Sequence, residues 1–266
     1  MSKFQLPVTK VHLGLLPLVY PVKAQLKDFV NISTFPTPPA QIDYSLAMTS
    51  DFTMSGNGPD PDNPPTMPGG AGDCFFAAAT NLIKVATANA QATQAALSTV
   101  QTLKAYGLCT GFDPKRPQDT DNGTEPGQGF TFLQHTGIAG HKFGPVAQID
   151  VTNEDLVRAA QFVFPGLMIG VAFPRDWEMA PVWDLTSSPI VGGHEIFGYA
   201  YDNTNPKVMA DIESWAKRIP FTWEAGRKFI TQLTVTIPPE WISDMNLAPS
   251  GLDLEQLVAN EQAMGA

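Results

Sequence analysis

The order of helical and strand patterns constrains the fold of this 266-residue chain most strongly. Apolar residues recur at helical spacing over residues 73–90, about 93–106, 130–137 and 151–164. After residue 165 the pattern becomes that of strands, over 167–173, 194–201, 208–215 and 229–237. Because the helices precede the strands instead of alternating with them, the sequence predicts an α+β fold, with a helical half followed by an antiparallel sheet.

Proline and glycine divide the chain further. Residues 1–70 are predicted to form an extended arm and loop, since prolines interrupt any helix there and the run 56–70 (GNGPDPDNPPTMPGG) has loop composition. Residues 71–245 are expected to form one domain, followed by an amphipathic tail over 246–266. The pattern leaves open whether the arm wraps its own domain or reaches a neighbouring subunit.

Charge and hydropathy exclude several functions. The net charge is −10 and no run of five basic residues occurs, which argues against nucleic acid as a partner. The apolar stretch 11–22 is broken by Pro17 and Pro21, and no stretch reaches the ~18–20 apolar residues of a membrane span. We therefore expect no export signal and a cytoplasmic or virion-associated protein.

No cofactor or metal site is predicted. The segment 119–125 (DTDNGTE) has a calcium-loop composition, but its glycine is one position early and the bidentate glutamate is missing, so we expect turn hydrogen bonds there. His135 and His141 have no further ligand at metal-binding spacing. Two cysteines, Cys74 and Cys109, do not make a disulfide framework.

Cys74 is the first candidate for chemistry. It lies in the first turn of the helix expected from residue 73, with Asp73 as its predicted N-cap. Unpaired backbone N–H groups and the helix dipole at this end favour a thiolate, which is the nucleophilic form of cysteine. The alternative is an apolar cysteine that only packs in the core.

His194 is the second candidate. It follows Gly192–Gly193 and opens a strand, and a turn centred near residue 204 would place it opposite residue 214. Glu213 and Trp215 would then also lie beside the imidazole, and Glu213 could accept its ring N–H and fix the tautomer. A histidine that only packs within the sheet is the alternative.

Together these features resemble the papain-like cysteine peptidases. The chain is most similar to a poorly characterised papain-like group in bacteria and their phages with GDC and GGH motifs. Its elements read here as Leu13–Pro17, Gly72–Cys74, Tyr106–Pro114 with Asp121–Gly123, Gly137–His141, Gly192–His194, Thr222–Trp223 and Pro249–Leu254. The resemblance implies a papain-like fold and a catalytic Cys74, His194 and Glu213.

The sequence departs from that family pattern in two ways. Pro68 occupies the position six residues before the cysteine, where the family has an amide that donates to the oxyanion, and Asn63 is a possible substitute donor. Glu213 stands where papain-like enzymes have asparagine. Two functions follow: a thiol hydrolase of peptide or amide bonds, or a virion structural protein on a catalytically impaired scaffold, with self or virion subunits bound through the arm.

Overall fold

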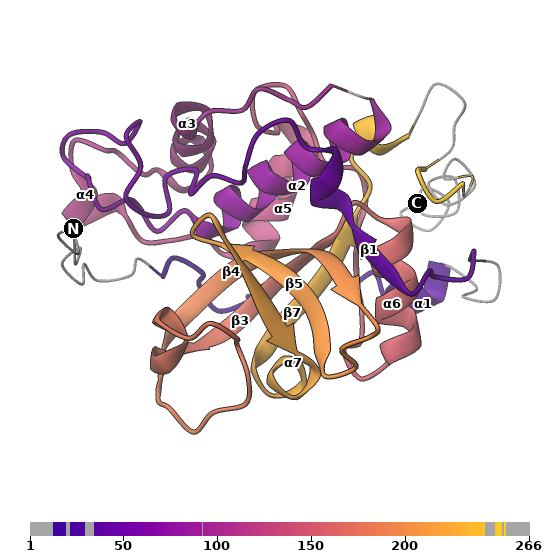
Figure 1. Ribbon diagram of the computed structural model, residues 1–266. Helices are drawn as coiled ribbons and strands as arrows, with labels where there is room; N and C mark the ends of the chain where they lie inside the picture. The colour runs from indigo at the N-terminus through magenta and orange to yellow at the C-terminus, as the bar shows by residue number, and fades with distance from the viewer. Residues whose placement is uncertain are drawn as a thin grey trace, which may run out of the picture.

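In the computed structural model the chain forms two layers, a group of helices and a curved antiparallel sheet (Figure 1). The structure describes residues 13–19, 22–29, 35–91, 93–242, 248–251 and 253. The predicted ends of the arm and of the tail therefore lie outside the described residues. Within the described part, no helix combines the length and the apolar character needed to cross a membrane.

Helix α2 (Cys74–Ala90) is the centre of the helical layer. Fifteen of its 17 residues are buried, because α3 (Thr99–Thr110) and α5 (Pro126–His135) cover its outer side and strand β4 its inner side. Alanine and other small residues predominate along it, which lets backbone elements approach from several directions. This helix therefore fixes the position of its first residue, Cys74.

The strands of the sheet are β1 (Gln41–Asp43), β2 (Val146–Gln148), β3 (Leu167–Pro174), β4 (Ile190–Asp202), β5 (Val208–Ser214), β6 (Lys217–Thr222) and β7 (Ile230–Thr236). Strands β3 to β7 follow helix α6 (Glu154–Val163) in the chain, as the sequence predicts, whereas the short strands β1 and β2 come earlier and were not predicted. The order is β2-β7-β3-β4-β5-β6, with β1 also paired to β4, and every pairing is antiparallel. The α+β prediction is thus confirmed.

Short helices complete the fold. They are α1 (Leu26–Phe29), α4 (Pro117–Thr120), α6 (Glu154–Val163) and α7 (Trp223–Phe229), with 3₁₀ turns η2 (Tyr44–Ala47), η3 (Arg175–Glu178) and η4 (Pro239–Trp241). Helix α7 and strand β6 were not predicted, because the residues between β5 and β7 show neither periodicity clearly.

Several predicted helix ends are wrong. Helix α3 begins at a capping box of Ser98 and Gln101 and continues through Gly107 to Gly111, whose left-handed conformation (φ 81°) ends it. Helix α6 begins at Glu154, three residues later than the predicted 151, and its N-cap is Asn153, whose side chain accepts from the Leu156 N–H. Asp73 does precede α2, but its side chain makes no capping hydrogen bond.

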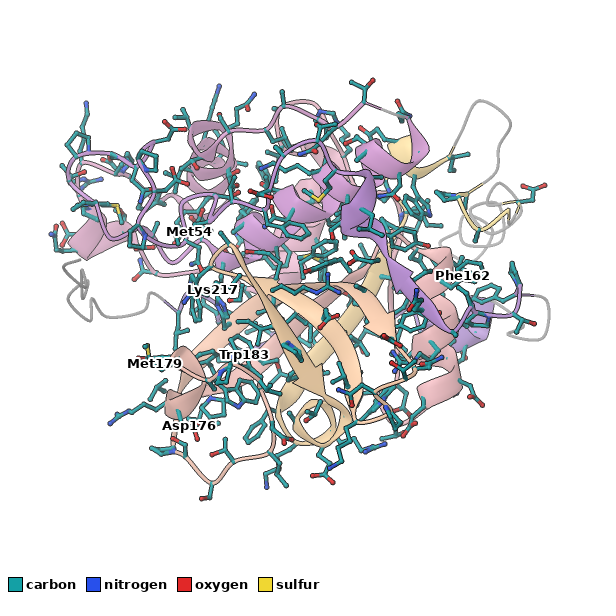
Figure 2. The ribbon with its side chains drawn as sticks, in the orientation of Figure 1. Met54, Phe162, Asp176, Met179, Trp183 and Lys217 are labelled. Carbon is teal, nitrogen blue, oxygen red and sulfur yellow. The ribbon has the colours of Figure 1, made fainter. Side chains whose placement is uncertain are left out.

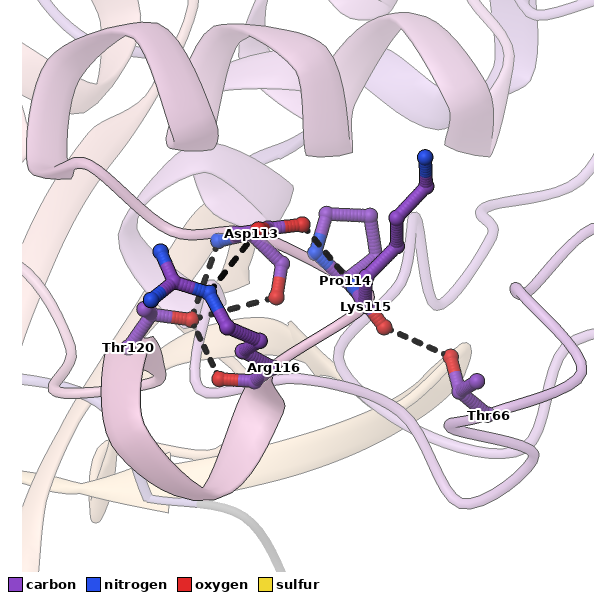
Figure 3. Close-up of polar contacts among 6 residues, drawn as sticks. All are labelled: Thr66, Asp113, Pro114, Lys115, Arg116 and Thr120. Atoms are coloured by element: carbon purple, nitrogen blue, oxygen red, sulfur yellow. Dashed lines mark hydrogen bonds and ion pairs between the residues drawn. The ribbon is translucent and has the colours of Figure 1, made fainter.

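The turn-rich segment 111–125 is ordered by its own hydrogen bonds (Figure 3). Asp113 accepts from the Lys115 backbone and pairs with Arg116, while Thr120 Oγ1 donates to the Arg116 carbonyl. Thr66 Oγ1 donates to the Pro114 carbonyl and ties this segment to the preceding loop. The polar side chains are used in turns, as the sequence predicts, and among the described residues no group of three acidic, histidine or cysteine side chains could hold a metal ion.

The arm wraps its own domain over its described length. Leu15, Leu26, Tyr44 and Met67 all belong to the main hydrophobic core. The side-chain hydroxyl of Tyr44 donates to the Phe162 carbonyl at the end of α6. Residues that the sequence marks as an extended arm are therefore part of the packed structure.

Candidate active site

Cys74 and His194 meet where α2 packs on β4. Both side chains are about 1% exposed. The backbone N–H of Glu195, the residue after the histidine, donates to Cys74 Sγ at 3.4 Å. The thiol on the first turn of the helix is thereby joined to the strand that carries the imidazole.

Aromatic rings hold the His194 imidazole. Trp215 stacks on it with ring centroids 4.5 Å apart and 16° between the planes, and Phe173 and Trp183 lie at 5.6 and 6.3 Å. Trp215 sits in the tight β5–β6 turn with φ 51°, a left-handed conformation that is strained for an aromatic residue. Trp223 of the family motif is not among these rings and lies under the guanidinium groups of Arg158 and Arg227.

The ring nitrogens of His194 have different surroundings. Nε2 is 2.8 Å from Ser214 Oγ. Nδ1 has no hydrogen-bond partner among the described residues. If Nε2 carries the hydrogen and donates to Ser214, Nδ1 keeps its lone pair and can accept a proton.

Glu213 does not reach His194, which corrects the expected hydrogen bond. Its carboxylate accepts from Asn81 Nδ2 at 2.7 Å and from the Ala216 N–H at 2.8 Å, so it holds the turn that carries Trp215. The observed register pairs Phe197 with Glu213, two residues away from the predicted one. Side chains alternate along a strand, so Ser214 lies on the face of His194 and Glu213 points to the other face, in the predicted register as well as in the observed one.

The amide beside Cys74 is Asn57, not a residue at the Pro68 position. Asn57 is buried and lines the small cavity that also contains Cys74, His194 and Trp215. Its Nδ2 donates one hydrogen to the Ala71 carbonyl at 3.0 Å. Pro68 is exposed and Asn63 donates to the Gly58 carbonyl, so neither belongs to this cavity.

The cavity is nearly closed. Its volume is about 10 Å³, close to the minimum for one water molecule. Met54 forms part of its wall, and a Cβ at Gly58 would lie 2.7 Å from Met54 Sδ and 3.5 Å from the Trp215 ring. Figure 2 shows Met54 between the helical layer and the tip of the β5–β6 hairpin, where Lys217 lies.

Residues 13–16 of the arm, here called the arm strap, cover Cys74. Leu15 N–H donates to the Gly193 carbonyl at 3.1 Å, and Leu16 N–H donates to the Thr124 carbonyl at 2.9 Å. The Gly14 carbonyl accepts from the Thr124 N–H, and the Gly14 backbone lies close enough to Cys74 to act on the pKa of its thiol. The strap is thus bonded to both layers and lies directly on the thiol.

A glycine is needed at position 14. A Cβ there would lie 1.6 Å from the Gly72 carbonyl oxygen, which is far inside van der Waals contact. The facing Gly123 has φ 81°, and a Cβ on it would lie 2.2 Å from the Gly14 oxygen. Close backbone approach therefore explains the glycine motifs around Cys74 in the sequence.

Burial sets the protonation of both candidate groups. It raises the pKa of the Cys74 thiol to about 12, although the N–H groups of Glu195 and Gly14 act in the opposite direction. Burial lowers the pKa of His194 to about 3. In this covered arrangement both groups are neutral, and no thiolate–imidazolium pair forms.

The sequence placed Ser214 near His194 but gave the orienting hydrogen bond to Glu213, and it indicated neither Asn57 as the local amide nor the strap as the cover of Cys74. The Ser214–Trp215 dipeptide did carry a signal, since both residues were expected near His194. Asn57 stands between two glycines in a loop, and no sequence spacing relates it to Cys74.

Comparisons with known proteins show the fold. No family model matches the chain, and no curated protein matches it either. Among solved structures, the cysteine protease xylellain from Xylella fastidiosa is similar with a TM-score of 0.61 and 13% identity, covering 86% of this chain and 97% of that one. Procathepsin B S9 from Trypanosoma congolense gives 0.55 and 10% identity over 84% and 82% of the two chains.

A third similar structure is the proform of the ragweed cysteine protease Amb a 11, with a TM-score of 0.52, 12% identity and coverage of 77% and 68%. The chain therefore has the papain-like cysteine protease fold, as the sequence predicts. At these identities the likeness concerns the fold alone.

Proposed function

We propose that this protein is a latent thiol hydrolase that cleaves peptide or related amide bonds. The observation that carries the proposal is the position of Cys74, on the first turn of the buried helix and joined to the histidine strand by the Glu195 N–H···Sγ hydrogen bond. The papain-like fold supports the same reaction class.

The chemistry assigns a role to each group. Cys74 Sγ attacks the substrate carbonyl carbon while its proton passes to His194 Nδ1. Ser214 holds Nε2 and fixes the tautomer. The Cys74 backbone N–H at the helix N-terminus is suited to stabilise the oxyanion, in the cavity that Asn57 also lines. His194 then protonates the leaving amine, and water hydrolyses the thioester.

The arm strap accounts for latency. It occupies the surface of Cys74 and contributes to the burial that keeps both catalytic groups neutral. Its departure would admit water and substrate, lower the pKa of the thiol and raise that of the imidazole. The proposed substrate is a peptide-like chain that lies where the strap lies now.

Gly14→Ala tests this proposal, because its methyl group cannot fit against Gly72. We expect Cys74 alkylation by iodoacetamide at pH 7.5 to accelerate at least about 10²-fold, since a fall of the thiol pKa toward its ordinary ~8.5 multiplies the thiolate fraction. Cys109, half-buried on α3, is the internal standard. Gly69→Ala is the matched control, since nothing lies near a Cβ at Gly69.

The dependence on His194 separates a hydrolase from an uncovered thiol. Adding His194→Ala to Gly14→Ala should slow Cys74 alkylation at pH 6 and abolish hydrolysis of a fluorogenic casein. An uncovered Cys74 that reacts at the same rate with and without His194 would contradict the hydrolase.

The second proposal is a structural role, in a virion or another assembly. The sealed, neutral Cys74–His194 site favours it, and so does the resemblance to a bacterial and phage group in the sequence. On this proposal the protein acts in the cytoplasm or in a particle and binds self or virion subunits through residues upstream of the strap. Removing residues 1–12 should then abolish self-association measured by light scattering, and leave it unchanged if the protein is only a hydrolase.

A further inference from the structure

A second cavity, of about 360 Å³, lies between the arm and the outer strands of the sheet. Its wall combines the arm segment 45–52 with one residue each of β4 and β6. It shares no lining residue with the small cavity around Cys74 and His194. Its volume falls in the range of small-molecule sites. The residues that carry the argument are Met48, Ser50, Asp51, Phe52, Tyr199 and Arg218.

Internal contacts fix both sides of this cavity. Gln94 Oε1 accepts from the N–H groups of Thr49 and Ser50 at 2.7 and 3.2 Å. Gln94 Nε2 donates to Ser50 Oγ at 2.7 Å. On the sheet side, the Tyr199 ring packs on Phe52 with centroids 4.6 Å apart. Because these contacts need no ligand, the cavity is formed before anything binds to it.

The hydroxyl group of Tyr199 has no hydrogen-bond partner among the described residues, although the side chain is only 3% exposed. Burial raises the pKa of Tyr199 above its usual range, so the hydroxyl keeps its proton and can donate. The nearby Tyr201 hydroxyl, in contrast, donates to the Pro39 carbonyl at 2.9 Å. Since buried polar groups are nearly always paired, the Tyr199 hydroxyl calls for a partner that enters the cavity it lines.

The wall of the cavity carries one charge of each sign. Arg218 donates to Asp43 at 2.5 Å and to Asp211 at 2.7 Å, which leaves further N–H groups for a ligand. The Asp51 carboxylate is exposed and has no hydrogen-bond partner among the described residues. An anion would be opposed by Asp51 and a cation by Arg218. The matching ligand is neutral, accepts hydrogen bonds from Tyr199 and Arg218, and donates to Asp51.

We propose that this cavity binds a neutral saccharide of one or two rings. Hydroxyl groups on adjacent ring carbons both donate and accept, so one pair of them can serve Asp51 together with Tyr199 or Arg218. The C–H face of the sugar ring is apolar and would lie on Phe52 and Met48. The groups that hold the sugar are those that lack internal partners, so its binding breaks no hydrogen bond of the fold. This inference does not depend on the proposed hydrolase.

Calorimetric titration of the full chain with cellobiose, maltose and N,N′-diacetylchitobiose tests the proposal. We expect at least one of them to bind with a Kd of about 1 mM or tighter. Tyr199→Phe removes only the free hydroxyl and should weaken that binding about 10-fold. Asp51→Ala should weaken it at least as much, because a carboxylate makes the stronger, charge-assisted hydrogen bond.

Two matched variants change the same residue types outside the cavity. Tyr201→Phe removes a hydroxyl that already has a partner, and Asp62→Ala removes another exposed carboxylate. Both should leave the Kd of the saccharide within about 2-fold of that of the wild type. If Tyr199→Phe did not fold, Asp51→Ala would decide the test, since Asp51 is exposed and supports no internal hydrogen bond.

L-Leucine, succinate and putrescine are the charged comparisons, as a zwitterion, an anion and a cation. Each should bind at least about 10-fold more weakly than the best saccharide. A charged compound that bound more tightly than all three saccharides would overturn the assignment. Absence of binding by all three saccharides would overturn it too, and so would binding that both Tyr199→Phe and Asp51→Ala left unchanged.

Discussion

Two consecutive residues of β4, His194 and Glu195, point to opposite faces of the sheet and have opposite surroundings. His194 is enclosed by aromatic rings and bonded at Nε2 to Ser214. Glu195 is equally buried, but its carboxyl group has no partner among the described residues. The side chain on one face of the strand is thus held by a hydrogen bond, and the side chain on the other face is not.

The difference shows which part of the site is preorganised. A base must keep its orientation before substrate arrives, and stacking together with one hydrogen bond provides that for His194. Glu195 has no such support, because neither oxygen of its carboxyl group has a partner among the described residues. The same strand therefore presents a hydrogen-bonded side chain on one face and an unpaired one on the other, through the alternation of its side chains.

The largest expected effect comes from removing the His194 imidazole. In the Gly14→Ala chain, His194→Ala should lower the rate of peptide hydrolysis by about 10²–10⁴-fold, because the thiol then lacks its proton acceptor. His135→Ala is the matched control, since His135 is exposed and distant from β4 in the fold. Equal rates for both variants would show that the imidazole takes no part in the reaction.

The second expected effect is on stability. His194 and Glu195 should make the free energy of unfolding depend on pH in opposite directions. Burial lowers the pKa of His194 from its usual 6.5 to about 3, so its contribution is present above pH 6.5 and is lost as pH falls toward 3. Burial raises the pKa of Glu195 above its usual 4.5, so its contribution is present below pH 4.5 and is lost as pH rises. Each slope should approach ~1.4 kcal/mol per pH unit.

Urea unfolding between pH 4 and 8 measures both slopes. Because burial also raises the pKa of Asp73 and of Glu213, the test uses the difference in unfolding free energy between wild type and each of His194→Gln and Glu195→Gln. If this difference changed with pH in the same direction for both variants, the proposed contrast between His194 and Glu195 would be wrong.

The sequence predicts the parts of this arrangement that depend on local periodicity. The helix beginning at Cys74 and the strand carrying His194 follow from apolar spacing and from the glycine pair, and both are confirmed as elements of an α+β fold. The predicted register between β4 and β5 is wrong by two residues, because the turn that joins the strands is centred later in the chain than residue 204. Glu213 was expected at His194 because it is next to the residue predicted opposite the histidine, but neighbours along a strand point to opposite faces.

The sequence also did not predict the contacts between segments that are distant along the chain. Asn57 and the arm strap approach Cys74 through backbone packing against glycines, and neither spacing nor periodicity encodes which glycines meet. The unpaired state of Glu195 depends on Gly170 and Gln232 in two other strands. A single sequence gives the face of each residue, but not the neighbours that leave it without a partner.

The smallest expected effect concerns the hydrogen bond that completes the His194 face. Ser214→Ala should lower stability by about 0.5–1.5 kcal/mol, because Nε2 loses its partner inside the protein while the stacking on Trp215 remains. Ser214→Thr keeps the hydroxyl and should restore most of the loss. In ¹⁵N-resolved spectra the alanine variant should show both neutral tautomers of His194 where the wild type shows one. If Ser214→Ala left a single tautomer, the aromatic enclosure alone would fix the ring, and the two faces of β4 would differ by packing instead of by hydrogen bonding.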